Sequence, residues 1–286
     1  MGIENLMEQH ENSPIFYINL DRAPARRAFM EKQFAALNLG NPTRFAALDV
    51  KNPATLQNAN YKPGGWRARW SLTPTEIANF ESHRALWQHI VDEDMKSAVI
   101  MEDDIFLSKT LKAGLYETAK RTEAFDVIRL DGNKGLYRFG PDLSVGAVHM
   151  RTILETVPSS ACYMVSLAGA AKLLQYSAVY CDHTDDFIFS QHTDVKTHQI
   201  WPAIALQGMF SKSTDPDASD ILVSERTSVK SESTAPNKGP LLYRISKELR
   251  RVYLRMARKL FKDRALLKRG GHIGYPPLAD DLPPYR

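Results

Sequence analysis

The sequence predicts an α/β protein built around a mostly parallel sheet. Short apolar runs at 14–20, 98–101 and 125–130 have the length and composition of buried strands, and segments with helical spacing of apolar residues separate them. Strands that alternate with helices are typical of a parallel sheet with helices on its faces. Ligands of such sheets bind at the carboxyl ends of the strands. We therefore expect the functional residues to follow these strands.

Three consecutive carboxylates follow the strand at 98–101. Glu102, Asp103 and Asp104 would repel one another, and such a run is tolerated mainly where a cation or solvent balances its charge. Alternate residues of an extended chain face the same way, so Glu102 and Asp104 are expected to project together. Carboxylate oxygens suit Mg²⁺ or Mn²⁺. A solvated acidic turn is the alternative interpretation.

The clearest helix start in the chain is at Thr73. Thr73 is a favourable N-cap, Pro74 suits the first helical position, and Glu76 completes a capping box. Helical spacing then continues as far as Val91. His83 lies on or beside the apolar side of this helix, where a histidine is more often a core residue than a ligand.

The charge of the chain is unevenly distributed. Segment 241–269 carries eleven Lys or Arg and two acids, a net of +9 within a total of +4, so the remainder carries −5. Ser, Thr, Asp, Lys and Pro dominate the segment 212–239 and indicate a mobile linker. We expect a folded domain at 1–211, a flexible polar linker at 212–240, and a C-terminal basic amphipathic helix and tail at 241–286.

Composition favours a cytoplasmic protein. No stretch approaches the ~20 apolar residues of a membrane-spanning helix, and the polar, acidic start lacks the pattern of a secretory signal. Cys162 and Cys181 match no zinc or redox spacing, and we expect both to be reduced.

Short motifs along the chain occur in a recognisable order. A strand ending in Asn-Leu is followed by an Arg pair (IFYINLDRAPARR, 15–27), then a helix carrying Ser-His (LTPTEIANFESHRALW, 72–87), then a strand ending in Glu-Asp-Asp (AVIMEDDI, 98–105). Together they resemble glycosyltransferase family 25, which includes bacterial lipooligosaccharide galactosyltransferases. Later segments fit as well, at 161–174, 179–183 and 202–207, so the resemblance covers roughly 14–207. The sequence departs from the family at Thr75, where Gly is usual, and at Cys181, where Val is usual.

This resemblance implies a Rossmann-like GT-A fold over 1–211, with a nucleotide-sugar donor, most often UDP-galactose, and Mn²⁺ or Mg²⁺ at the Glu-Asp-Asp motif. Asp104, helped by Glu102, would hold the metal against the two phosphates of the donor. Asp103 would accept hydrogen bonds from ribose or sugar hydroxyls.

Four further residues are implied as donor-binding groups. Asn19 and Arg22 would lie over the nucleotide at the end of the first strand. Arg26 would approach a phosphate, since a guanidinium pairs well with phosphate oxygens; a solvated helix face is the alternative. The resemblance also implies that His83 belongs to the donor site.

The second acidic cluster, 182–186, holds the candidate catalytic bases. The implied reaction transfers a hexose, galactose being the first choice, from a UDP-sugar to a glycan acceptor of lipooligosaccharide or lipopolysaccharide, with inversion. One carboxylate must then take the proton of the acceptor hydroxyl. Asp182 is the first candidate and Asp185 the second; alternatively, Asp182 or Thr184 caps a helix.

The basic segment after 241 has its own implications. Apolar side chains follow one helical face from 242 to 260, and Arg and Lys occupy much of the rest. This pattern is typical of a helix on anionic lipid, so we expect a peripheral protein on the inner face of the plasma membrane and no nucleic-acid partner. Packing against the body and nucleic-acid binding are alternatives for the helix. Two rival functions remain: a metal-dependent phosphoesterase, and a membrane-surface or nucleic-acid-binding protein with an inactive body.

Overall fold

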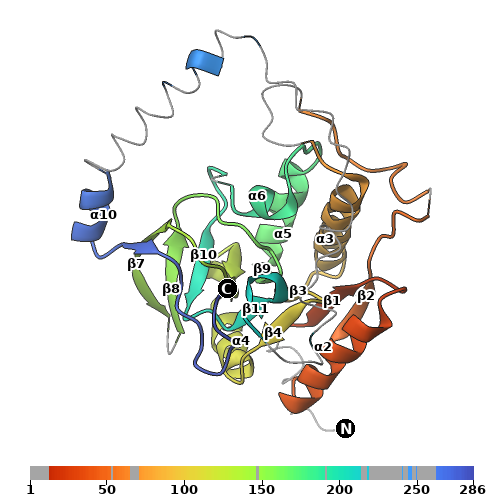
Figure 1. Ribbon diagram of the computed structural model, residues 1–286, viewed down its shortest axis with the longest axis horizontal. Helices are drawn as coiled ribbons and strands as arrows, with labels where there is room; N and C mark the ends of the chain where they lie inside the picture. Colours follow the sequence, from red (N-terminus) through yellow and green to blue (C-terminus); the bar gives the residue numbers. More distant parts are fainter. Residues whose placement is uncertain are drawn as a thin grey trace.

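The computed structural model describes residues 13–52, 54–64, 71–145, 148–190, 192–213, 218, 240, 244–246, 249 and 262–286. These residues form a nine-stranded sheet, a small three-stranded sheet, and helices on both faces of the large sheet (Figure 1). The α/β class that the sequence predicts is confirmed.

The large sheet is mixed, whereas the sequence predicted a mostly parallel one. Its strands are β1 (Ile15–Asn19), β2 (Thr43–Ala46), β3 (Ser97–Glu102), β5 (Val127–Arg129), β7 (Tyr137–Val145), β8 (Val148–Ile153), β9 (Cys162–Ser166), β10 (Thr197–Trp201) and β12 (His272–Gly274), in the spatial order β12-β7-β8-β10-β5-β9-β3-β1-β2. β1 is parallel to β2 and β3, and β5 to β10. β9 runs antiparallel between β3 and β5, and β8, β7 and β12 continue antiparallel. Since β9 is buried along its whole length, its apolar run reads like that of a parallel strand.

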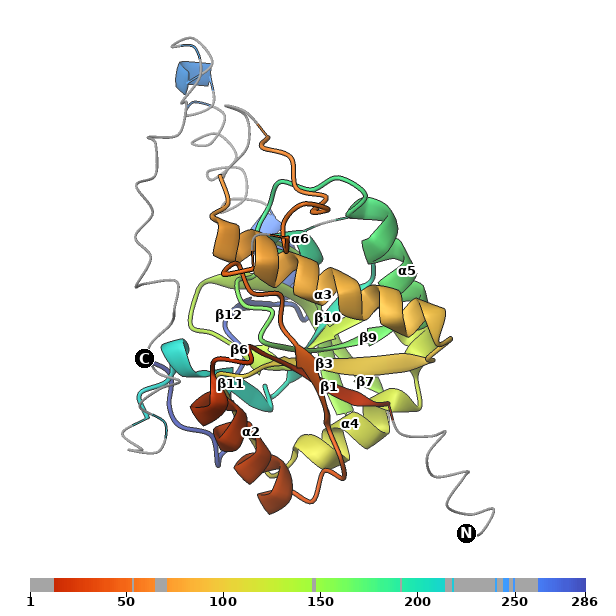
Figure 2. The same cartoon turned by 90° about the vertical axis from the view of Figure 1, so that its right-hand side faces the viewer.

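Helices cover both faces of the large sheet (Figure 2). They are α2 (Pro24–Ala36), α3 (Pro74–Asp92), α4 (Leu111–Ala119), α5 (Leu167–Tyr176) and α6 (Thr184–Ile188), with short 3-10 turns η2 (Thr122–Ala124) and η3 (Gly208–Phe210). Successive strand residues face opposite sides: Phe16 and Ile18 pack in the core under α3, α5 and α6, whereas Tyr17 packs with Met30 and Phe34 of α2. With both faces covered, the strand ends are where a ligand can approach.

Helix α3 begins as the sequence predicts. The Thr73 side chain accepts from the Glu76 backbone N–H, and the Glu76 carboxylate accepts from the Thr73 backbone N–H at 2.9 Å. Pro74 occupies the first helical position. The helix therefore carries His83 to its buried side three turns later.

The small sheet extends the carboxylate end of β3. It consists of β4 (Ile105–Leu107), β11 (Ala205–Gln207) and β6 (Asp131–Gly132). β11 is antiparallel to β4, with Gln207 opposite Ile105, and parallel to β6. This register places Gln207 directly beside the carboxylates that precede β4.

The last described segment packs on the body. α10 (Asp263–Lys268) leads into β12, and Arg138 of β7 donates to both oxygens of Asp263 at 2.6 and 2.7 Å. Residues 275–286 then follow the small sheet, where the Ala203 N–H donates to Pro277 O at 2.8 Å and the Arg286 N–H to Phe210 O at 2.7 Å. The predicted amphipathic helix at 242–260 lies almost entirely outside the described residues.

Within the described part of the chain, the helices are too short or too polar to cross a membrane.

Candidate active site

Three of the predicted donor-binding residues meet at the ends of β1 and β3. The two strands pair in parallel with Ile18 opposite Glu102, so Asn19 and Asp103 follow side by side. Asn19 Nδ2 donates to Asp103 Oδ2 at 2.7 Å, and Arg26 Nη1 on α2 donates to Asp103 Oδ1 at 3.1 Å. Burial raises the pKa of Asp103, while the Arg26 charge and the Asn19 hydrogen bond oppose that shift. Asp103 therefore fixes the position of Arg26 beside the next carboxylate.

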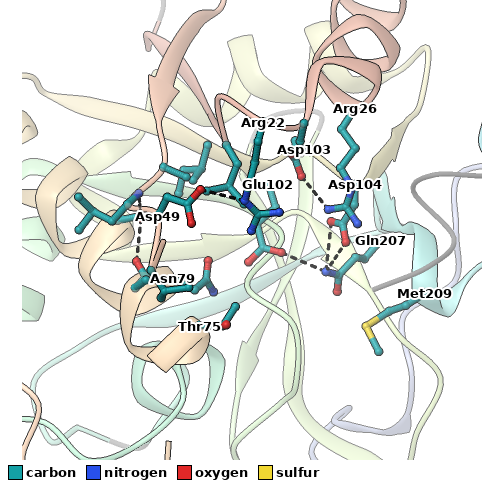
Figure 3. Close-up of a pocket in the computed structure, with 18 residues that line it drawn as sticks. Arg22, Arg26, Asp49, Thr75, Asn79, Glu102, Asp103, Asp104, Gln207 and Met209 are labelled. Atoms are coloured by element: carbon teal, nitrogen blue, oxygen red, sulfur yellow. Dashed lines mark hydrogen bonds and ion pairs between the residues drawn. The ribbon is translucent and has the colours of Figure 1, made fainter. Parts of the chain in front are cut away.

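Glu102 and Asp104, which we call the carboxylate pair, project together as the sequence predicts. Gln207 Nε2 donates to Glu102 Oε2 at 3.0 Å and to Asp104 Oδ1 and Oδ2 at 3.2 and 3.1 Å (Figure 3). The two carboxylates thus converge on a single amide group supplied by the small sheet.

The carboxylate pair has the chemistry of a cation site. Burial, together with the Glu102 carboxylate, raises the pKa of Asp104 to about 8. This shift means that the surrounding protein gives the second negative charge too little compensation. Oxygen donors of this kind suit Mg²⁺ or Mn²⁺. No group of three His, Cys, Asp or Glu side chains gathers to hold a metal among the described residues; the third polar group that meets the pair is the amide of Gln207.

His83 lies behind the carboxylate pair rather than on the pocket wall. Its side chain is fully buried, and its Nε2 lies 3.5 Å from Glu102 Oε1 without a hydrogen bond. Its Nδ1 lies 2.9 Å from the hydroxyl of Tyr163, which also accepts from Trp87 Nε1 at 2.9 Å. The Tyr163 hydroxyl needs an acceptor of its own, and His83 Nδ1 provides it. With Nδ1 as acceptor, the ring hydrogen lies on Nε2, which faces Glu102, so His83 meets the carboxylate pair through Glu102.

A pocket opens between the ends of β1 and β2 and one side of α3 (Figure 3). Its lining includes the carboxylate pair, Asp103, Arg22 and Arg26. Arg22 Nε donates to Asp49 Oδ2 at 2.8 Å, and both side chains line the pocket. The other lining residues are Ile18, Leu20, Ala23, Ala47, Leu48, Val50, Thr75, Ala78, Asn79, Ser82, Gln207 and Met209. Two cationic side chains over an apolar wall, ending at buried carboxylates, suit a nucleotide whose phosphates point toward the carboxylate pair.

The two candidate bases have different surroundings, and neither lines this pocket. Asp185, in the first turn of α6, accepts from the Ser159 N–H at 2.9 Å. Ser159 in turn contacts Gln207 through its hydroxyl at 3.3 Å. Asp182 lies before α6, and neither it nor Thr184 caps that helix, because His183 occupies the N-cap and makes no side-chain cap bond. Asp185 is thus connected to the carboxylate pair through Ser159 and Gln207.

Sequence reasoning missed several polar residues of the site. It assigned no role to Gln207, although this residue ends the motif at 202–207. It also assigned no role to the buried Arg129, Asp131 and Ser159, whose hydrogen bonds connect β5, β6 and the loop before β9. A polar residue at the end of each apolar run was the available signal for Asp131 and Gln207.

Comparisons with known proteins agree with the resemblance. The model of glycosyltransferase family 25 (LPS biosynthesis protein) matches residues 12–188, more than half of the chain. Lipooligosaccharide biosynthesis protein lic2B of Haemophilus influenzae is 26% identical over 264 residues, covering 86% of this chain and 95% of that protein. Procollagen galactosyltransferase 1 of Danio rerio is 31% identical over 108 residues, covering 36% of this chain and 18% of that protein.

One of the matching relatives is described as inactive. The match to the probable inactive glycosyltransferase 25 family member 3 of Bos taurus is 29% identical and covers 46% of this chain and 23% of that protein. The matched segments of the animal relatives named above thus span 18% and 23% of those proteins' lengths. The family model matches more than half of the chain, and the order of the motifs agrees with it. The chain belongs to glycosyltransferase family 25.

Proposed function

We propose that this protein is an active glycosyltransferase that moves a hexose, galactose being the first candidate, from a UDP-sugar to a glycan acceptor of lipooligosaccharide or lipopolysaccharide. The proposal includes a GT-A-type arrangement and a divalent cation, Mn²⁺ or Mg²⁺, held by the carboxylate pair. Family membership supports the reaction class, and the names of the relatives from Haemophilus and Danio support the acceptor and the galactose.

The observation that carries the proposal is the carboxylate pair in the lining of the pocket. Glu102 and Asp104 converge on one neutral amide, and the raised pKa of Asp104 reflects their uncompensated charge. When bound there, a divalent cation would neutralise the charge that develops on the departing diphosphate. An inactive body would have no need to keep the buried Asp104 beside Glu102, because two carboxylates held together away from water without a cation cost stability.

The remaining donor-site residues position the nucleotide. Arg26, anchored by Asp103, supplies a charged hydrogen-bond donor toward the phosphates. Arg22, anchored by Asp49, closes over the nucleoside. Asn19 holds Asp103 in place, so its contribution is to orient a group that contacts the ligand.

Transfer with inversion needs one carboxylate beside the acceptor hydroxyl. We assign this role to Asp185; its hydrogen bond from the Ser159 N–H, and the contact of Ser159 with Gln207, support the assignment. Asp185→Asn should lower kcat by at least 100-fold and leave UDP affinity unchanged. Asp182→Asn should change neither kcat nor UDP affinity. The opposite pattern would restore Asp182 as the base.

A lipid-linked acceptor also gives the basic segment after 241 a role. We propose that this segment holds the protein on the anionic inner face of the plasma membrane, with the body in the cytoplasm. Co-sedimentation of the full chain with anionic vesicles, but not with neutral ones, and its loss in high salt would support this arrangement. Equal binding to both kinds of vesicle would contradict it.

The test of the enzymatic proposal is calorimetric titration of UDP into the full chain with Mn²⁺ and then with EDTA. We expect binding only with metal, and its loss in Asp104→Asn. Glu123→Gln, which alters an exposed carboxylate in η2, is the matched control and should bind like the native protein.

A panel of UDP-sugars with lipooligosaccharide acceptors then identifies the donor. Failure of UDP to bind under every condition would overturn the proposal. Hydrolysis of phosphodiesters without sugar transfer would instead identify a phosphoesterase.

A further inference from the structure

Gln207 turns the nitrogen end of its side-chain amide toward the carboxylate pair. A cation bound at the pair would need the oxygen end there instead. The Nε2 end donates to Glu102 and Asp104, while the Oε1 end points back to the Ser159 hydroxyl at 3.3 Å. A side-chain amide has one donor end and one acceptor end of nearly equal shape, and the hydrogen-bond network decides which way it faces. Without a cation, two carboxylates favour the donor end.

We propose that Gln207 is the third protein ligand of the cation, and that its amide turns so that Oε1 faces the carboxylate pair and Nε2 faces Ser159. This inference rests on the proposed function, since it assumes a cation at the pair. It adds a ligand that lies outside the Glu-Asp-Asp motif and a residue that sets its orientation.

The position of the Gln207 amide fits a ligand of an octahedral cation. For metal–oxygen bonds of about 2.1 Å, adjacent ligand atoms lie about 3.0 Å apart. Gln207 Nε2 lies 3.0 Å from Glu102 Oε2 and 3.1 Å from Asp104 Oδ2. An oxygen in place of this nitrogen would therefore stand at ligand spacing from both carboxylates. Rotation of the terminal amide alone achieves the exchange, and the backbone at Gln207 is already fixed by the pairing of β11 with β4.

Ser159 is arranged to receive the turned amide. Its hydroxyl has a single hydrogen, which the buried Asp131 carboxylate takes in a short contact with Oδ2. In the orientation seen here, Gln207 Oε1 competes with Asp131 for this single hydrogen, and its contact with Ser159 Oγ, at 3.3 Å, is the longer of the two. After the turn, Gln207 Nε2 would donate to Ser159 Oγ, and Ser159 would still donate to Asp131. In this series of hydrogen bonds from Gln207 through Ser159 to Asp131, each donor then has its own acceptor.

Buried contacts fix Ser159 in this position. The guanidinium of Arg129 is fully buried and donates to the carbonyl oxygens of Ser159 and Pro158 at 3.1 and 2.6 Å. The same group lies 3.3 Å from Asp131 Oδ1. Ser159 has φ of 75°, a left-handed conformation that costs a residue other than glycine some strain. Ser159 is thus a positioning residue that acts on the cation through Gln207.

The test is direct binding of Mn²⁺, measured from the paramagnetic resonance signal of the free ion, with and without UDP. Gln207→Leu keeps much of the side-chain volume and removes the oxygen, and we expect Mn²⁺ affinity to fall at least tenfold. Gln207→Glu keeps an oxygen toward the pair and should bind Mn²⁺ as tightly as the native protein or more tightly. Gln88→Leu, an exposed amide of α3, is the matched control and should leave the affinity unchanged.

Ser159→Gly separates orientation from packing. Glycine accepts the left-handed backbone, so the variant removes the hydroxyl without adding strain. We expect Mn²⁺ affinity to fall about tenfold, as is typical when a group that orients a metal ligand is lost. In the Gln207→Glu background the same substitution should have little effect, because a carboxylate presents an oxygen at either end and needs no orientation. A merely structural role for Ser159 would produce the same loss in both backgrounds and would overturn its part of the proposal.

The outcomes distinguish this inference from the proposed function. Mn²⁺ binding that is lost in Asp104→Asn but stays within twofold in a folded Gln207→Leu would overturn the third ligand and leave the transferase intact. If Gln207→Leu does not fold, an unchanged affinity in Ser159→Gly would refute the orienting contact on its own. Failure of the native protein to bind Mn²⁺, with or without UDP, would overturn both.

Discussion

Replacement of Tyr163 by Phe is the sharpest test of the buried contacts behind the carboxylate pair. The Tyr163 hydroxyl accepts from Trp87 Nε1 and meets His83 Nδ1, both at 2.9 Å, and all three side chains are fully buried. Burial also raises the pKa of Tyr163 well above its usual range, so the hydroxyl keeps its hydrogen. The substitution removes one oxygen and leaves two buried polar groups without a partner.

Each buried group left unpaired costs about 1–3 kcal/mol, so Tyr163→Phe should lower the free energy of unfolding by about 2–6 kcal/mol. Urea denaturation followed by circular dichroism measures this difference. Tyr176→Phe is the matched control: its hydroxyl bonds Asp194 at the surface, and its loss should change stability by less than about 0.5 kcal/mol. A loss below about 1 kcal/mol for Tyr163→Phe would refute the assignment of the hydroxyl to two buried partners.

The same variant tests how His83 acts on the site. Without the Tyr163 hydroxyl, nothing fixes the hydrogen of His83 on Nε2, 3.5 Å from Glu102 Oε1. We expect UDP affinity in the presence of Mn²⁺ to fall severalfold, measured by calorimetry at a temperature where the variant is folded. If Tyr163→Phe lowers stability but leaves UDP affinity unchanged, the contact between Tyr163 and His83 contributes only to stability.

Three further predictions concern other parts of the site. Arg26→Met should weaken UDP binding about tenfold or more, since a charge-assisted hydrogen bond contributes about 1.5–3 kcal/mol; calorimetric affinity within twofold of the native value would contradict the phosphate contact. Burial raises the pKa of Asp131 to about 6. Asp131 therefore binds a proton more tightly in the folded protein than in the unfolded chain, and the free energy of unfolding falls as pH rises from 4 to 6. Relative to Asp131→Asn, the native protein should therefore lose about 3 kcal/mol across this window in urea titrations at each pH, and a constant difference would show that Asp131 titrates normally. Gly132→Ala would bring a Cβ to within 2.2 Å of the Tyr285 hydroxyl; it should release the C-terminal segment, detected as faster proteolysis after Gly274, whereas a native digestion pattern would refute the contact.

Local chemistry explains which features the sequence predicts. The capping box at Thr73 depends on residues within one helical turn, and it forms as expected. Projection of Glu102 and Asp104 to one side follows from their positions two residues apart at a strand end. Asn19 and Arg26 reach Asp103 because adjacent parallel strands end at the same edge of the sheet. These features need only a short segment or one strand pairing.

Features that depend on distant pairings are not predictable in this way. The direction of β9 is invisible in a run that is buried along its whole length. Gln207 reaches Glu102 from 105 positions away only because β11 pairs with β4 in one register. His83 could be placed on the apolar side of its helix, but not behind Glu102, since that position depends on how α3 packs on β3. The contact of Asp185 with the Ser159 N–H likewise joins residues 26 positions apart.

The carboxylate pair and Gln207 belong to different sheets, so the site depends on how the two sheets are held together. The large sheet supplies Glu102, at the end of β3, and Asp104 follows it; the small sheet supplies Gln207. Residues 275–286 lie against the small sheet, where Ala279 and Leu282 pack with Phe106 and Leu206 in one buried cluster. Neither Gln207 nor this segment falls within the 12–188 that match the family model. The segment that the family model matches therefore carries the charged groups of the site, while residues beyond it supply the neutral amide and the packing that hold those groups in register.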